Sequence, residues 1–115
     1  MYNLEAQIIK WLNEEIDVKV CHTVPKNTPS EFVTVERTGG KVDSRSIDRA
    51  TLAVQAWAKT PSQAAALAYK LRDIFAKQNT PNGIYSVKVQ ELYEFVDMKT
   101  NRPRYQIILS VVAII

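Results

Sequence analysis

The sequence predicts an α+β domain in which two helices pack on one face of an antiparallel sheet of about four to five strands. Three observations favour this class. Apolar residues recur at helical spacing in two segments, and they alternate with polar residues in several others. The segments follow in the order α-β-β-β-α-β-β. The length of 115 residues suits one domain, so residues 1–115 are expected to share one core, with the other sheet face partly free.

The first helix is predicted over residues 3–16, with Asn3 placed to act as its N-cap. Its apolar residues recur one turn apart and form a stripe that a sheet could cover: Leu4, Ile8, Trp11 and Leu12. Residues 18–24 then form a short extended piece. Pro25 and Pro29 exclude a central strand there, because proline lacks the amide hydrogen that both neighbours of a central strand require, so the piece is a linker or an edge.

The middle of the chain predicts two strands joined by a long exposed loop. Residues 31–38 alternate in polarity, and Gly39-Gly40 is expected to end that strand. Residues 41–49 are polar and mixed in charge, which favours an exposed excursion. Residues 51–58 alternate again and place small or branched apolar side chains on one face, where a helix could pack closely: Leu52, Val54, Ala56 and Ala58.

The second helix has the clearest start signal, because Thr60-Pro61-Ser62-Gln63 is a capping box with proline at the first helical position. Its apolar stripe is Ala64, Leu67, Ala68, Leu71, Ile74 and Phe75. Residues 79–83 end it, and a strand then runs toward Phe95. The last strand covers residues 105–113 and is apolar on both faces, so it is expected to be central or covered on both sides.

Composition excludes several classes of protein. Hydrophobic residues make up 46% and charged residues 23% of the chain, a balance typical of a folded globular protein rather than a disordered one. The net charge of +3 is small and the charges are interspersed, unlike the basic stripe of a duplex-binding protein. Cys21 is the single cysteine and cannot form an internal disulfide. The apolar run 107–115 is too short to span a bilayer as a helix.

No pattern in the sequence assembles an active site, and we expect no catalytic residue, cofactor or metal ion. Cys21 and His22 are neighbours on an extended segment, so their side chains point to opposite faces. His22 is also the only histidine, which leaves a zinc site without enough ligands. Gly39-Gly40-Lys41 lacks the spacing and the following Ser or Thr of a phosphate-binding loop, and it is better interpreted as a turn.

The charged excursion has two interpretations. It is either a solvated loop or an arm that contacts a neighbouring subunit or faces a lumen, because exposed loops on a rigid sheet often carry recognition. The candidate interface residues are Arg37, Lys41, Asp43, Arg45, Asp48, Arg49 and Trp57. For Trp57, a position in the core or on a sheet face is the more usual one.

Several blocks of the chain, in order from Val24 onward, together carry a family resemblance. They are Val24-Pro25, residues 29–40, residues 48–49 with 52–58, residues 67–69 and residues 102–106. This series resembles the tail terminator proteins of long-tailed bacteriophages, also called tail completion or head-to-tail joining proteins.

The resemblance implies a structural virion protein with no active site. Such a protein would form a hexameric ring on the last ring of the tail tube, end polymerisation and present a docking surface to the completed head. The implied partners are copies of the chain itself, the major tail tube protein and a head completion or connector protein. DNA would pass through the lumen without specific binding, and no membrane is involved. The implied location is the head-proximal end of the phage tail, after assembly in the host cytoplasm.

Two alternatives remain open at this point. The nearest is a neck or head-tail connector protein of the same phage. The other belongs to a different class, a small nucleic-acid-binding module that would use the open sheet face and Trp57.

Overall fold

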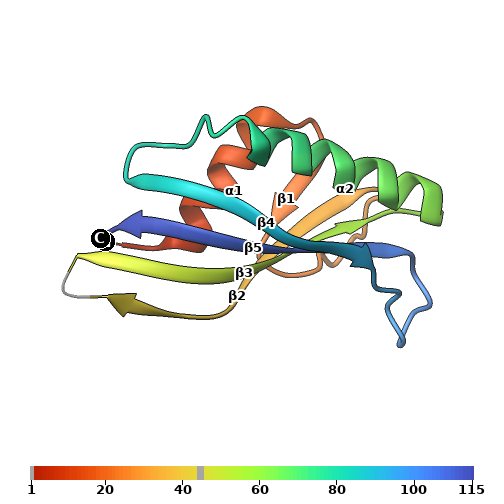
Figure 1. Cartoon of the computed structure of the whole chain (residues 1–115). Coiled ribbons are helices and arrows are strands. Elements are labelled where there is room, and N and C mark those ends of the chain that lie inside the picture. Colours follow the sequence, from red (N-terminus) through yellow and green to blue (C-terminus); the bar gives the residue numbers. More distant parts are fainter. Residues whose placement is uncertain (1, 44–45) are drawn as a thin grey trace.

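A computed structural model describes residues 2–43 and 46–115. The elements in chain order are α1 (Leu4–Glu15), β1 (Lys19–Cys21), β2 (Phe32–Asp43), β3 (Ile47–Trp57), α2 (Pro61–Ala76), β4 (Ile84–Glu94) and β5 (Arg104–Ile114). The α+β class and the predicted order of elements are therefore confirmed. Figure 1 shows both helices on the same side of one twisted sheet, with one end of the sheet reaching beyond them.

The strands form one sheet in the order β1-β2-β3-β5-β4, and this sheet is mixed. The prediction of a purely antiparallel sheet was wrong at β1, which pairs parallel to β2, with Lys19 opposite Phe32 and Cys21 opposite Thr34. The reason is the path of residues 22–31, which brings the chain back so that β2 begins beside the beginning of β1. β1 has only three residues and lies at an edge, as the prolines after it required.

The predicted excursion over residues 41–49 was also wrong. β2 continues through Gly39-Gly40 to Asp43, and β3 starts at Ile47, so residues 41–43 and 47–49 belong to two long paired strands. A bulge between Arg37 and Gly39 absorbs one extra residue, and Gly40 adopts a φ of 102° without ending the strand. We call residues 39–43 and 46–50 the arm. Arg45 lies outside the described residues.

The core lies between the helices and one face of the sheet, as the apolar patterns predicted. Both helix starts are capped as expected: the side chains of Asn3 and Thr60 accept hydrogen bonds from the Ala6 and Gln63 amides, each at 3.1 Å. The Trp11 and Phe75 rings, 5.8 Å apart, join the two helices. The fully buried side chains of this core come from both helices and from alternate positions of the strands, among them Leu4, Ile8, Leu12, Val33, Val35, Leu52, Val54, Leu71, Phe75, Ile107 and Leu109.

The opposite side of the sheet, which we call the open face, has no helix over it in the part of the chain that the structure describes. β5 lies between β3 and β4, which confirms its predicted central place. Its apolar residues on the open face, Ile108 and Val112, are only half-buried. One layer of helices therefore covers one face of the sheet, and no helix of the described residues covers the other.

Candidate assembly surface

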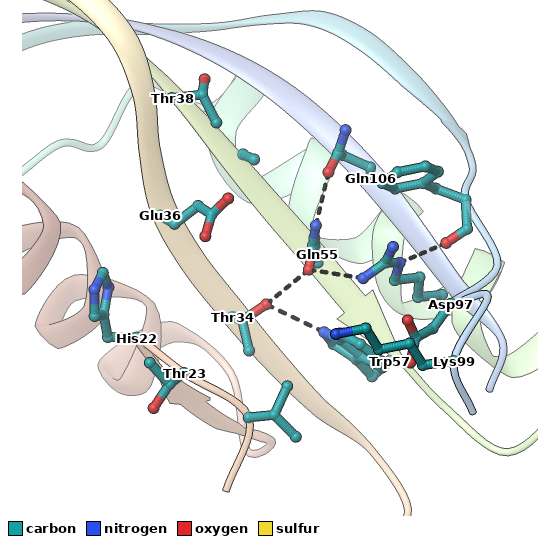
Figure 2. Close-up of a pocket in the computed structure, with 14 residues that line it drawn as sticks. His22, Thr23, Thr34, Glu36, Thr38, Gln55, Trp57, Asp97, Lys99 and Gln106 are labelled. Atoms are coloured by element: carbon teal, nitrogen blue, oxygen red, sulfur yellow. Dashed lines mark hydrogen bonds between the residues drawn. The ribbon is translucent and has the colours of Figure 1, made fainter. Parts of the chain in front are cut away.

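A row of polar side chains crosses the open face. The strand register aligns Thr34 of β2, Gln55 of β3, Gln106 of β5 and Tyr93 of β4. The Thr34 hydroxyl donates to Gln55 Oε1 at 3.2 Å, and Gln55 Nε2 donates to Gln106 Oε1 at 2.7 Å (Figure 2). Gln106 Nε2 then donates to the Tyr93 hydroxyl. Because these groups satisfy one another, the face can be bare without leaving Thr34 and Gln106, both buried, without partners.

Next to this row, aromatic rings and arginines form a packed layer. The Phe32 and Trp57 rings stack with centroids 5.2 Å apart and planes 12° apart. The Arg104 guanidinium lies 4.9 Å from the Trp57 centroid and 4.3 Å from that of Phe95, and Trp57 Nε1 donates to the Thr34 hydroxyl at 3.1 Å. Trp57 is only 5% exposed, so its ring cannot stack on a nucleic-acid base. This placement counts against the nucleic-acid alternative.

A shallow groove of about 600 Å³ runs over these residues. Figure 2 shows His22 and Thr23 on one side of its floor and Asp97 and Lys99 on the other. Among residues 2–43 and 46–115, no cluster of three or more His, Cys, Asp or Glu side chains could hold a metal ion. The floor offers hydroxyl and carboxamide groups, which suit hydrogen bonding to another protein surface.

Two of the predicted interface residues, Asp48 and Arg37, pair with each other within the chain: Asp48 is buried, and Arg37 is partly exposed. Asp48, 1% exposed, accepts two hydrogen bonds from the Arg37 guanidinium at 2.7 and 2.8 Å and one from the Tyr2 hydroxyl at 2.7 Å. Arg37 also donates through Nε to the Gly39 carbonyl, next to the bulge. Tyr2, Arg37 and Asp48, which we call the Asp48 group, link the segment before α1 to both strands of the hairpin. It therefore holds the arm in place and is not itself a docking surface.

The other predicted residues are distributed along the arm. Arg49 Nε and Asp43 Oδ2 form an ion pair at 2.5 Å, and both side chains are substantially exposed, at 54% and 42%. Lys41 is exposed on the same face, because its cross-strand partner is Arg49. Of the seven predicted residues, the structure thus brings Lys41, Asp43 and Arg49 together on the surface.

Sequence reasoning missed an apolar area beside the arm. Tyr85 is 78% exposed and Ile114 is 57% exposed, and they line a hollow of about 280 Å³ with Ile47, Ser86, Val112 and the Arg49 side chain. The signal was present in β5, which is apolar at consecutive positions up to its last residue. Only the absence of a covering layer turns that pattern into an exposed surface.

The Asp48 group predicts a specific loss of stability in acid. Hydrogen bonds from Arg37, and to a lesser degree from Tyr2, hold the pKa of the Asp48 carboxyl below its usual value of 3.8. The stabilisation is complete above that value and is lost as the pH falls through the lower folded pKa, because the unfolded carboxyl takes up a proton first. We expect the free energy of unfolding in urea to decline below about pH 5, less steeply in Asp48→Asn. Equal slopes for the two proteins would contradict this assignment.

Asp97 also contributes to the pH dependence of stability, so its contribution must be separated from that of Asp48. The Thr100 hydroxyl lowers the pKa of the exposed Asp97 carboxyl, which therefore contributes a slope of the same sign. Since Asp97 is present in both proteins, the difference between their slopes isolates Asp48.

Comparisons with known proteins add no family to this description. No protein-family model matches the chain, and no curated protein shows significant similarity to it. Within residues 2–43 and 46–115, neither helix has the length and apolarity needed to cross a membrane.

Proposed function

We propose that this chain is a structural subunit of a ring at the head-proximal end of a phage tail tube, where it ends tube polymerisation and provides the docking surface for the head. The observation that carries the proposal is that helices cover only one of the two faces of the sheet in the described residues. Helices cover one face, while the opposite face of β2, β3, β5 and β4 has no helix over it in the described residues and carries the hydrogen-bonded polar row, with the apolar hollow at the arm end. A bare face with internally satisfied polar groups is suited to repeated contact with other protein subunits.

The bare sheet face supports only a general role in assembly. The tail position and the partners are proposed from the resemblance of the sequence blocks to tail terminator proteins. The proposed partners are other copies of the chain in a hexamer, the major tail tube protein on one side and a head completion or connector protein on the other. DNA passes through the lumen without sequence-specific contacts. A closed ring requires that each copy contact the next through two different surfaces, and that the rotation relating neighbouring copies bring the last copy back to the first.

The proposal predicts that the purified chain assembles on its own. Light scattering coupled to gel filtration should give a mass near six times 13.1 kDa, and electron microscopy should show rings as wide as a tail tube. Added to growing tubes of the major tail protein, the rings should sit at one end and stop elongation.

The outcomes of this experiment separate the alternatives. A chain that stays monomeric at high concentration and does not bind tubes would overturn the proposal. Rings that bind isolated head portals but ignore tube ends would instead identify a neck or connector protein. Binding to single-stranded DNA that weakens steeply with salt, without rings, would favour the nucleic-acid module.

A further inference from the structure

Two edges of the sheet have no strand beside them in the described residues. β1 pairs with β2 only as far as Thr34, so residues 36–43 of β2 have a free outer edge. β4 is the last strand at the other side, and no strand of the described residues pairs with its outer edge, where the Gln78 carboxamide caps the backbone of Val87 alone. Free edges present unpaired amide and carbonyl groups, which either need protection or bind another strand.

The directions of the strands make these two edges complementary. β2, β3, β5 and β4 are each antiparallel to the next, so β2 and β4 run in opposite directions. A second copy, placed beside the first in the same orientation, would bring its β2 antiparallel to β4 and continue the alternation. Within one copy, Asp43 is level with the beginning of β4, because Asp43 pairs with Ile47, Ile47 with Ile114, and Ile84 with Ala113. For the arm to pair with the middle of β4, the next copy must therefore be shifted along the strand direction.

From this geometry we propose that the arm edge of one copy, residues 39–43, pairs antiparallel with residues 88–93 of β4 in the next copy. The inference rests on the proposed ring, for which it supplies the subunit contact. Figure 1 shows the arm reaching beyond both helices, so no helix of its own copy blocks the approach. The contact is head-to-tail, the type that closes rings.

The residues on the two edges select one register. Val42 and Val89 both point to the helix side, since Val42 pairs with the buried Asp48 and Val89 with the buried Leu109. Placing Val42 opposite Val89 puts Asp43 opposite Lys88 on the open face. The bulge between Val89 and Glu91 skips Gln90, so the next position sets Lys41 opposite Glu91. Both charged pairs are then of opposite sign.

The neighbouring registers are less favourable. With Val42 opposite Val87, Lys41 would lie opposite Lys88. With Val42 opposite Leu92, Asp43 would lie opposite Glu91. Like charges directly opposite one another destabilise a strand pair, whereas opposite charges stabilise it. The charge pattern therefore specifies the register in which the apolar side chains also meet.

A disulfide scan tests this contact directly. Paired residues on antiparallel strands have Cα atoms about 4.5–5.5 Å apart, within the range that a disulfide bridges. In a Cys21→Ser background, the chain with Asp43→Cys and Lys88→Cys should form a ladder of covalent multimers on mild oxidation, ending at the ring. The matched control, Asp43→Cys with Tyr69→Cys on the exposed side of α2, should give no ladder.

Charge exchange gives a second readout that does not depend on cysteine chemistry. Lys41→Glu and Glu91→Lys should each raise the concentration for half-assembly about threefold or more at low salt, and the double exchange should restore it. Lys70→Glu, on the exposed surface of α2, serves as the control. Rings without a ladder and without rescue would overturn the edge pairing while leaving the proposed ring intact. A chain that never assembles would overturn both.

Discussion

Replacing Asp48 with alanine is expected to lower the free energy of unfolding by about 3 kcal/mol. The substitution leaves the Arg37 guanidinium and the Tyr2 hydroxyl without the carboxylate that accepts three hydrogen bonds from them. Removing one member of a buried pair costs more than the pair contributes, because the remaining charge is left without compensation. Arg37 is 29% exposed and can recover part of its hydration, which places the expected loss at the lower end of the range for buried pairs.

Asp43→Ala is the matched control for this variant. It removes the same kind of side chain from the same hairpin, but its partner Arg49 is 54% exposed, so the expected loss is below about 1 kcal/mol. Urea unfolding at neutral pH measures both. Similar losses in the two variants would mean that the Asp48 group does not anchor the arm more firmly than a surface pair does.

The elements with strong local signals were predictable from the sequence. Thr60-Pro61 fixes the start of α2, and the stripes of α1 and α2 identify the faces that they bury. The alternation in residues 51–58 correctly gave the side of β3 that the helices cover. These features depend on residues close together in the chain, where periodicity reports burial directly.

The arm and the first strand were not predictable in this way. At the end of the hairpin the residues facing the open side, Lys41, Asp43 and Arg49, are exposed, so no apolar alternation marks the strands, and a glycine pair inside a bulge looks like a turn. The parallel pairing of β1 depends on the path of a ten-residue connection. Neither the direction of a short edge strand nor its partner is encoded in its own three residues.

The candidate surface was likewise predictable only where it depends on residues close together in the chain. The described charged residues at 37–49 all lie on one hairpin, but the sequence could not separate the buried Asp48 from the exposed Asp43. The difference arises from partners 11 and 46 residues away, Arg37 and Tyr2. Likewise, the polar row on the open face exists only because the register of the sheet aligns Thr34 with Gln55 and Gln106.

Gly40→Ala is expected to destabilise the protein by about 2 kcal/mol or more and to displace the end of β2 from β3. Gly40 has a φ of 102°, and a Cβ there would lie 2.2 Å from the Arg49 carbonyl oxygen and 2.6 Å from the Ala50 Cα. Both are backbone atoms of the paired strand, so relief requires the strands to separate. Gly39→Ala is the control, since a Cβ there meets no atom within 4 Å. Urea unfolding and amide exchange at residues 41–43 measure the effect, and equal behaviour of the two variants would rule out this strand geometry. If the arm edge joins neighbouring copies, Gly40→Ala should also abolish ring assembly under conditions in which the monomer remains folded.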